Sequence, residues 1–586
     1  MAKDVLRIAN CSGFYGDRLS AAREMVEGGP IDVLTGDYLA ELTMMILFKD
    51  RQKDPTAGYA RTFLRQMEDV LATCAQRGIK IVSNAGGLNP AGLAHQVREL
   101  ARRLGIQVRV AHIEGDDLLP RLPELQAQGL ELRHMDKDIP LRDLGAQVLT
   151  ANAYLGGWGI AEALRRGADV VICPRVTDAA LVVGPAAWYF DWARDDWDRL
   201  ASAIVAGHII ECGPQCTGGN YSFFREVPAI ERIGFPLAEM HPDGSFVITK
   251  HPGTGGLVSV GTVTAQLLYE IQGPRYFNPD ATARFDTIQL RQEGPDRVLV
   301  HGVRGEPPPP TTKVCINYLG GYRNSVTFVL CGLDIDEKAK LAQDTLWSLV
   351  GGKDHFAEVF VDLVRWDRPN PRRNEEAFAH LTVVVKDPDP SKVGRAFTNK
   401  AIEMALANYP GFFVTHPPTD ASPYGVYWPT LVPSELVEHR VVLDDATIPI
   451  EPVATGPSPE VEPPVVELPP PPEGETLRVP LGLLAGARSG DKGGNANVGL
   501  WTRRPDAFSW LRAYLTTERF RQLVPEAAGL KVERYEFPNL LALNFIVCGL
   551  LGDGVAASTR MDPQAKSFGE YVRAKVVEIP RALLAE

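Results

Sequence analysis

The 586-residue sequence has no long apolar run, no block of basic residues and few cysteines. A helix that crosses a bilayer needs about 20 consecutive apolar residues, and glycine, proline or charge interrupts every run here well before that. The 61 lysines and arginines face 73 acidic residues, a net charge of -12, and basic residues cluster only in pairs such as Arg102-Arg103. These absences predict a soluble protein with neither a membrane nor a nucleic acid as partner.

The eight cysteines are too scattered to suggest a disulfide framework. Residues 1–12 contain no apolar stretch of the kind that directs secretion, so we expect reduced thiols and a cytoplasmic location. Cys212, Cys216 and the more distant Cys173 raise the question of zinc, but no Cys-x-x-Cys or spaced histidine pair accompanies them. Free cysteines are commonly buried as small apolar residues. We therefore predict no bound metal.

From residue 5 to about 275, short apolar runs end in polar or glycine-rich loops and continue into amphipathic helices. This alternation is typical of an α/β domain and predicts a Rossmann-like N-terminal sheet. Ligands of open α/β sheets bind beyond the carboxyl ends of the strands, so the loops after five of these runs should share one edge. The five runs are residues 5–9, 31–34, 79–83, 108–112 and 168–172.

Three further segments follow the α/β domain, which we place at residues 1–280. Residues 281–451 contain apolar runs without regular intervening helices, which is typical of an α+β domain with antiparallel strands. Residues 452–476 are rich in proline and predict an extended linker. Residues 477–586 are about the size of one small domain, and a ferredoxin-like α+β fold fits their pattern.

The stretch 486–499 (GARSGDKGGNANVG) is the densest group of glycines and polar side chains in the chain. Apolar runs flank it, so the sequence predicts a tight loop between two strands. Its five glycines permit positive φ angles, which would let successive N–H groups converge on an anion. A P-loop is disfavoured, because Lys492 stands between Asp491 and Gly493. The side chains that we expect to bind substrate are Arg488, Asp491, Lys492, Asn495 and Asn497; alternatively, they pair with one another and with the turn backbone.

Several distinctive motifs occur in order along the chain: NCSGFYGDR at 10–18, TGDYLAE at 35–41, NAGGLNP at 84–90, CPRVTD at 173–178, GGN at 218–220 and HPGTGG at 251–256. Together they resemble the acyclic terpene utilisation family, AtuA, and residues 486–499 resemble its companion ferredoxin-fold domain. The resemblance implies a role in bacterial degradation of acyclic isoprenoids such as citronellol and geraniol, whose intermediates are branched acyl-CoA thioesters. It supplies no catalytic residues, so the roles below come from residue chemistry.

Acidic side chains in the loops at the predicted sheet edge are candidate general bases. They are Asp37, Glu114, Asp116, Asp117 and Asp178. The alternative for each is a helix cap. Asp178 has further support from Arg175 and Thr177, since a guanidinium can bind a carboxylate or phosphate through two hydrogen bonds. The candidate catalytic residues are Asp178, Arg175, Glu114, Asp37 and His251.

Glycine-rich loops on the same edge are the candidate substrate-binding elements. Residues 250–256 precede a helix expected from residue 260, whose N–H groups would face a CoA phosphate or an enolate. Val258 replaces the third glycine of a dinucleotide fingerprint, so NAD or FAD has little support. Gly218 and Asn220 would offer donors to a carbonyl oxygen. Ordinary turns are the alternative in each case.

The candidate substrate-binding set also includes loops after the first and third predicted strands. Cys11 is the preferred thiol, because a following helix N-terminus would lower its pKa. The full N-terminal set is Cys11, Ser12, Gly13, Asn84, Gly86, Asn89, Thr177, Gly218, Asn220, Lys250, Gly253 and Thr254.

The sequence favours an enzyme that acts on a branched acyl-CoA thioester by proton abstraction and addition or elimination, that is, a hydratase or carbon–carbon lyase. Coenzyme A is then part of the substrate, and we expect no tightly bound cofactor. Two alternatives stay open: a noncatalytic scaffold that binds acyl-CoA enzymes, and a thioester hydrolase with Cys11 as nucleophile. We expect a homo-oligomer, open to association with acyl-CoA enzymes, in which residues 486–499 reach the N-terminal sheet edge of their own or of a neighbouring subunit.

Overall fold

The computed structural model describes residues 4–457 and 460–584. They form two compact units. The larger unit extends to Asn317 and also holds Tyr427–Val555 and the chain from Asp562 onward; the smaller holds Tyr318–Val426 and Ala556–Met561. No helix in the described part of the chain is both long and apolar enough to cross a membrane.

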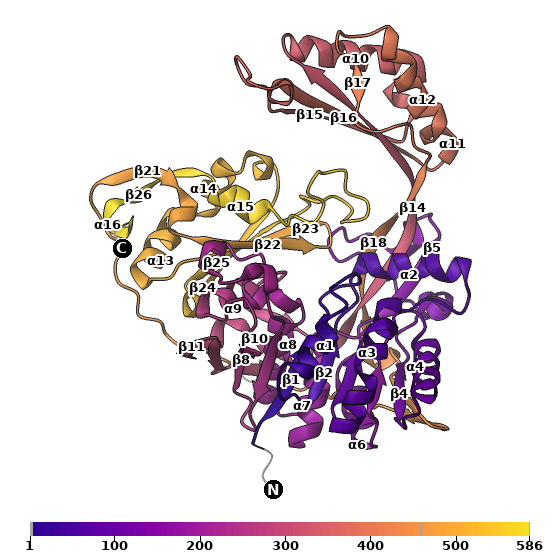
Figure 1. The fold of residues 1–586 in the computed structure, drawn as a ribbon, viewed down its shortest axis with the longest axis vertical. Coiled ribbons are helices and arrows are strands. Elements are labelled where there is room, and N and C mark those ends of the chain that lie inside the picture. The colour runs from indigo at the N-terminus through magenta and orange to yellow at the C-terminus, as the bar shows by residue number, and fades with distance from the viewer. Residues whose placement is uncertain (1–3, 458–459, 585–586) are drawn as a thin grey trace. The chain divides into compact units, whose positions relative to one another are not determined.

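Within the described residues, an 11-stranded mixed sheet forms the centre of the larger unit (Figure 1). Its five central strands are parallel and correspond to the five predicted runs. The loops that follow them therefore meet at one edge, as predicted. Across the sheet the strands are β1 (Leu6–Asn10), β2 (Val33–Gly36), β3 (Lys80–Ser83), β6 (Val170–Ile172) and β4 (Val110–Glu114). The chain is a mixed α/β protein with several sheets, and the Rossmann-like arrangement stays a prediction.

Antiparallel strands extend the parallel centre on both sides. On one side lie β7 (Pro236–Met240), β8 (Phe246–Lys250), β12 (Arg297–His301) and β11 (Gln289–Gly294), and on the other β19 (Arg440–Leu443) and β20 (Ala446–Pro449). Residues 281–317, which the sequence assigned to a middle segment, thus contribute strands to the same sheet.

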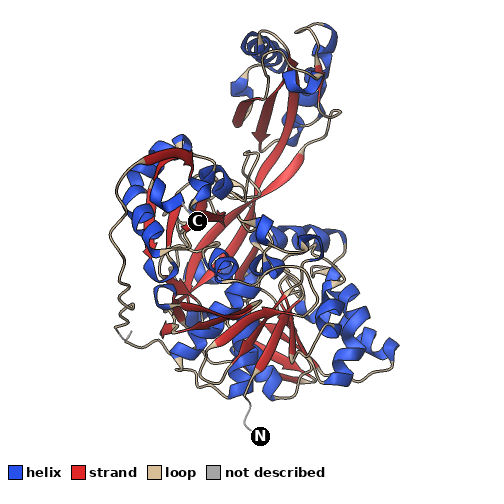
Figure 2. Ribbon diagram, turned by 60° about the vertical axis from the view of Figure 1, so that its left-hand side comes forward, coloured by secondary structure: helices blue, strands red, loops and turns tan. Residues whose placement is uncertain are grey.

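Helices cover both faces of the large sheet (Figure 2). The period of two along a strand explains this, because Ile8 of β1 packs into the core on one face and Ala9 into the core on the other. The first face is covered by α6 (Trp158–Arg165), α7 (Ala180–Phe190), α8 (Trp197–Ile210) and α9 (Val260–Leu267), and the second by α1 (Ala21–Glu27), α3 (Arg61–Arg77) and α4 (Pro90–Leu104). Both faces of the parallel strands are therefore buried.

The C-terminal part of the larger unit has its own antiparallel sheet and core. The strand order is β22 (Gly486–Lys492), β23 (Asn495–Trp501), β25 (Ala542–Val547) and β24 (Val532–Phe537). The helices α13 (Pro505–Tyr514), α14 (Thr517–Leu523) and α15 (Phe568–Arg573) belong to this part, and β21 (Thr476–Pro480) pairs with β26 (Val576–Pro580). The Phe520 and Phe545 rings stack with centroids 4.3 Å apart and help to close the core.

The stretch 486–499 is a β-hairpin, so the prediction of a loop between two strands was wrong. Its two strands pair in antiparallel register up to a turn at Gly493 and Gly494. Of its five glycines, only Gly493 has a positive φ, 61°. The N–H groups of the strands are used in pairing and do not converge on an anion.

Other glycines of the hairpin lie so close to neighbouring residues that a larger side chain would not fit. A Cβ added to Gly490 would lie 2.5 Å from Cε2 of Tyr269, and one added to Gly499 would lie 2.5 Å from Cβ of Leu268. Both neighbours are buried just beyond the end of α9. Glycine therefore lets the hairpin pack directly against the N-terminal part of the chain.

The smaller unit is an antiparallel sheet packed against helices, and sheet and helices share one hydrophobic core. The chain enters it along β14 (Thr311–Cys331), which pairs with β16 (Phe378–Asp387), and the edge strand is β15 (Glu358–Arg365). Its helices include α10 (Ile335–Val350) and α12 (Arg395–Glu403), whose apolar residues share a core with the sheet.

Candidate functional site

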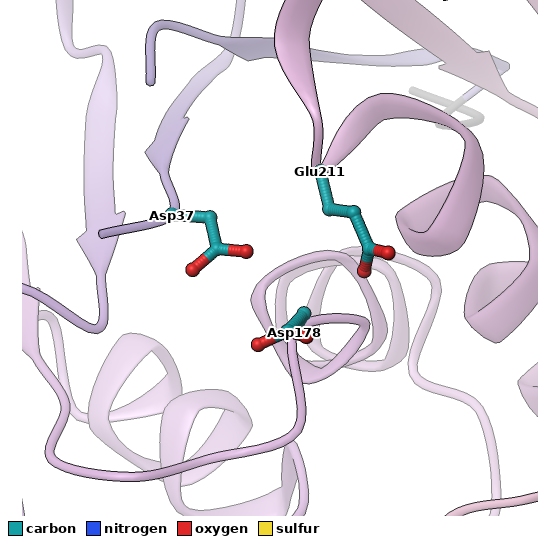
Figure 3. Close-up of side chains that lie close together, drawn as sticks. All are labelled: Asp37, Asp178 and Glu211. Carbon is teal, nitrogen blue, oxygen red and sulfur yellow. The ribbon is translucent and has the colours of Figure 1, made fainter. Parts of the chain in front are cut away.

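Three carboxylates meet near the carboxyl edge of the parallel strands, and Figure 3 shows them converging from three separate elements. Asp37 follows β2, Asp178 precedes α7, and Glu211 follows the last residue of α8. One carboxylate oxygen of each lies within 4.8 Å of those of the other two. Asp37 and Glu211 are buried, and Asp178 is half-buried. These three residues are called the acid cluster below.

The loops after β1 and β3 fix the position of Asp37. The Asp37 N–H donates to the Ser12 carbonyl at 2.9 Å, and Asn84 Nδ2 donates to Asp37 Oδ1 at 2.6 Å. Asn84 Oδ1 in turn accepts from the Tyr38 N–H at 2.8 Å. Ser12 and Asn84, both candidate substrate-binding residues, therefore position Asp37 in this structure.

The end of α8 is held in the same way by the last residue of β1. Asn10 Nδ2 donates to the carbonyls of Ile210 and Glu211, at 2.6 and 3.0 Å. His208, one turn earlier on α8, places its Nδ1 3.3 Å from Glu211 Oε1. The sheet edge thus positions Glu211 as well as Asp37.

Burial and mutual repulsion change the ionisation of the acid cluster. Burial raises the pKa of Asp37, and Asp178 and then Glu211 raise it further. Burial also raises the pKa of Glu211, followed by Asp178 and a further acid, Glu270. Burial raises the pKa of Asp178, and the charge of Arg175 offsets part of this increase. The cluster therefore favours a proton or a cation over three free negative charges.

Arg175 is the buried cation beside the acid cluster. Its Nη1 donates to Asp178 Oδ1 at 3.0 Å and to the Leu39 carbonyl at 3.3 Å. Its Nη2 lies 3.3 Å from the Tyr154 hydroxyl, and the guanidinium stacks 4.4 Å from the centroid of that ring. Burial disfavours the charge, but Tyr154, Asp178 and Glu41 hold the pKa of Arg175 above its ordinary value. Arg175 therefore stays charged and orients Asp178.

A further acid, Glu41, is joined to Arg175 through Tyr154. The Tyr154 hydroxyl donates to Glu41 Oε1 at 3.0 Å. Burial raises the pKa of Glu41, but Lys313 and Arg175 outweigh it and lower that pKa to about 2. Glu41 is therefore ionised at neutral pH, in contrast to the acid cluster.

The remaining predicted acids lie outside the acid cluster. Asp116 Oδ2 accepts from Asn152 Nδ2 at 2.8 Å and from the Arg175 N–H at 3.2 Å, so it supports the backbone under the arginine. Burial raises its pKa to about 7. Asp117 accepts from the Leu119 N–H at 3.0 Å, a local bond at the start of a short helix whose N-cap is Leu118. Glu114 pairs with His112 at 2.9 Å.

The C-terminal hairpin brings a further carboxyl toward this region. Asp491, near the end of β22, has its pKa raised to about 8 by burial, then by Glu270, with Lys566 opposing. Lys566 Nζ lies 3.4 Å from Glu270 Oε1 and 3.9 Å from Asp491 Oδ1. Glu270 also raises the pKa of Asp178. Asp491, Glu270 and the acid cluster therefore form one connected electrostatic system.

The other hairpin side chains contact the N-terminal part of the chain. Arg488 hydrogen-bonds Gln215 and stacks 4.4 Å from the Tyr269 ring centroid. Lys492 Nζ lies 5.9 Å from the Tyr276 ring centroid, and its charge lowers the pKa of Glu211 after burial and two acids have raised it. Asn497 Oδ1 accepts from the Glu270 N–H at 2.8 Å, and Asn495 Nδ2 donates to Asp136 at 3.0 Å.

The polar side chains of the predicted anion-binding loop at 250–256 have partners within the protein. His251 Nε2 lies 2.8 Å from the Met25 carbonyl, and Lys250 Nζ donates to the Thr254 carbonyl at 2.9 Å. Ser259 caps the helix that follows, by accepting from the Thr262 N–H at 3.2 Å. Gly253 lies in the same loop with a φ of 78°. The structure gives this loop a turn geometry, and its polar side chains contact neighbouring backbone groups.

Several other candidate residues have local structural roles. Asn89 caps α4 by accepting from the Gly92 N–H at 2.9 Å, and the Gly13 N–H donates to Asp17 at 2.8 Å. Gly86 allows close packing, since a Cβ there would lie 2.6 Å from the Cys173 carbonyl oxygen. Gly218 and Asn220 occupy left-handed turn positions. Thr177, next to Asp178, has a buried hydroxyl without a hydrogen-bond partner in the described structure.

The prediction of a lowered pKa for Cys11 was wrong. Cys11 is buried, and burial, followed by Cys74 and Asp17, raises its pKa. Burial likewise raises the pKa of the Cys173, Cys212 and Cys216 thiols. At neutral pH these thiols are protonated, and protonated thiols are poor nucleophiles and poor metal ligands.

Five residues of this region were not predicted from the sequence: Glu211, His208, Tyr154, Glu41 and Lys313. A signal for Glu211 was present, because it directly follows the apolar sequence Ile209-Ile210 at the end of a buried helix. An acid in such a position is either paired or functional. Tyr154 and Lys313 had no comparable signal, since their partners come from distant segments.

Two protein-family models together match most of the chain. The model described as "Acyclic terpene utilisation family protein AtuA" matches residues 6–443. The model described as "AtuA ferredoxin-like domain" matches residues 479–578, the part that contains the hairpin. Comparisons with curated proteins and with solved structures find no match.

Proposed function

We propose that this chain, which belongs to the acyclic terpene utilisation family AtuA, is an enzyme that acts on a branched acyl-CoA thioester. Membership of the family implies involvement in acyclic terpene utilisation. The proposed reaction is proton abstraction followed by addition or elimination, as in a hydratase or a carbon–carbon lyase. Coenzyme A enters the site as part of the substrate.

One observation carries the proposal: acids that are far apart in sequence, Asp37, Asp178 and Glu211, converge beside the buried cation Arg175. Their altered pKa values support it, because groups with such values are concentrated at functional sites. The bonds that hold Asp37 and Glu211 are made by side chains of neighbouring strand ends. Such positioning is typical of sites at the carboxyl edge of an α/β sheet.

The C-terminal hairpin supplies a group suited to proton transfer. General acid–base catalysis is most efficient when the pKa of the group is near the working pH, and the pKa of Asp491 is raised to about 8. Asp491 therefore exchanges a proton with the substrate, while Arg175 acts as a positioning residue for Asp178 and Tyr154. Both Nη atoms of Arg175 already contact protein groups, which supports positioning over direct substrate binding.

Deuterium exchange tests this function directly. The purified full-length chain is incubated in D₂O with a panel of branched acyl-CoA thioesters. Mass spectrometry measures the incorporation of solvent deuterium into each thioester and the addition of water to it or its loss. We expect exchange with at least one thioester and a loss of at least about tenfold in Asp491→Asn and Arg175→Lys. Asp444→Asn, which removes an exposed partner of Arg109, is the control and should keep full activity. No exchange and no raised melting temperature with any thioester would overturn the proposal.

A further inference from the structure

We infer that Asp37, Asp178 and Glu211 form a binding site for a divalent metal ion of the Mg²⁺ or Mn²⁺ type (Figure 3). Their oxygens lie within 4.8 Å of one another. Around an octahedral ion with bonds of about 2.1 Å, ligand oxygens lie about 3 Å apart in cis and about 4.2 Å apart in trans. Small side-chain rotations therefore bring the three carboxylates to coordination distance.

A second observation, separate from the spacing of the acids, is a pair of buried acceptors that face each other. Glu211 is 8% exposed and His208 is 1% exposed, and in the described structure neither Glu211 Oε2 nor His208 Nδ1 has a hydrogen-bond partner. His208 Nε2 lies 3.1 Å from the Gln266 carbonyl, which only accepts, so Nε2 carries the ring proton. The Nδ1 lone pair then faces Glu211 Oε1 at 3.3 Å. Glu211 Oε2 is therefore a buried carboxylate oxygen of the acid cluster that can accept a positive centre.

Two side-chain cations, Arg175 and Lys492, offset the negative charge of the acid cluster only in part. Arg175 is bonded to Asp178, Leu39 and Tyr154, and the ammonium of Lys492 lies over the ring of Tyr276. A single proton on Glu211 would satisfy the His208 lone pair but would leave Asp37 and Asp178 facing each other. An ion shared by all three carboxylates would engage Glu211 Oε2, which is buried without a partner in the described structure, and would neutralise Asp37 and Asp178 as well.

The chemistry of the ligands selects the type of ion. All three ligands are carboxylate oxygens, which suit Mg²⁺ and Mn²⁺, whereas zinc sites usually include nitrogen or sulfur. The sequence-based expectation of no metal rested on cysteine and histidine spacing, and neither residue type is a ligand in this cluster.

A bound ion also removes a difficulty in the proposed reaction. Three carboxylates repel the oxyanion that forms when a proton leaves a thioester substrate, whereas a divalent ion would polarise the thioester carbonyl. This role rests on the proposed function, but metal binding itself is measured without substrate.

Manganese binding to the full-length chain tests the inference. The protein is treated with EDTA, desalted and titrated with MnCl₂, and electron paramagnetic resonance measures free Mn²⁺. We expect one Mn²⁺ per chain, and an affinity at least 100-fold lower in Glu211→Gln and in Asp37→Asn. Asp280→Asn is the matched control, because Asp280 is also buried but accepts from the Gly157 N–H outside the cluster. It should bind Mn²⁺ as the wild type does.

Thermal melting separates loss of the site from loss of the fold. Glu211→Gln removes a repelled charge, so without metal it should melt at or above the wild-type temperature. Mn²⁺ should raise the melting temperature of the wild type but not that of Glu211→Gln. Mn²⁺ binding without thioester turnover would support the metal site and refute the proposed reaction. No binding at millimolar Mn²⁺, or equal binding in the wild type and Glu211→Gln, would overturn the inference.

Discussion

The Asp491 carboxyl sits in a buried and acidic environment, and this makes the stability of the protein depend on pH. Its pKa is raised from 3.8 to about 8 in the folded chain. Between these values the folded state binds a proton that the unfolded state does not, so the free energy of unfolding falls as the pH rises from about 4 to about 8. Asp491→Asn removes this dependence. Urea unfolding at pH 5, 7 and 9 measures this. The free energy of unfolding of Asp491→Asn should rise relative to that of the wild type as the pH rises.

An acid with the opposite shift provides the control for Asp491. The hydrogen bond from Arg504 lowers the pKa of Asp506, so its contribution to stability is present at neutral pH and is lost as the pH falls through the lowered pKa. Asp506→Asn should therefore lose stability relative to the wild type at pH 7, with the difference shrinking in acid. If the free energy of unfolding changed with pH in the same way for Asp491→Asn and the wild type, the buried and acidic environment of Asp491 would be contradicted.

Single residues also show which parts of the site were predictable. Asp37 and Asp178 follow apolar strands in polar loops, and that local pattern suffices to place an acid at a sheet edge. Glu211 follows a helix, so the same rule did not apply to it. Tyr154 contacts Arg175 and Glu41, and such a contact depends on tertiary packing that no local pattern encodes.

At the level of elements, the parallel strands were predictable and the hairpin was not. Each parallel strand is a continuous apolar run before a polar loop, as expected for strands buried on both faces. Residues 486–499 alternate small and polar residues, and glycine normally weakens a strand. The hairpin forms because Tyr269 and Leu268 pack against Gly490 and Gly499. The cause lies more than 200 residues away in the sequence.

Gly490 tests whether this close packing positions the hairpin. Gly490→Ala places a Cβ 2.5 Å from the buried Tyr269 ring, so the hairpin must shift, at a cost of about 1–3 kcal/mol of stability. Because Asp491 is the next residue, thioester turnover should fall at least about tenfold. Chemical denaturation and deuterium exchange measure the two effects.

The control for Gly490→Ala is Gly529→Ala. A Cβ at Gly529 meets nothing within 4 Å, so stability should change by no more than about 0.5 kcal/mol, and turnover should be unchanged. If Gly490→Ala lost stability but kept full turnover, the hairpin would be a packing element without a role in the reaction.

At the scale of the whole molecule, the C-terminal domain is joined to the N-terminal sheet domain by more than the linker. Asn544 Nδ2 donates to the carbonyls of Ile271 and Gln272, at 3.1 and 2.7 Å. Trp501 and Leu540 are buried in the same apolar core as the helices of the large sheet. Buried apolar and amide contacts of this kind are those that hold an interface together.

The two parts should therefore stay associated when the linker is cut. A protease site inserted after Gly456, where the chain is exposed, divides the protein into residues 1–456 and 457–586. After cleavage we expect both fragments in one gel-filtration peak, with thioester turnover retained. Leu540→Asp places a charge in the shared core and should separate the fragments. Arg503→Ala removes an exposed ion pair with Glu226, which contributes at most about 1 kcal/mol, so it should leave them together. Separate peaks for the unmutated fragments would mean that the linker, rather than the interface, brings the hairpin to the acid cluster.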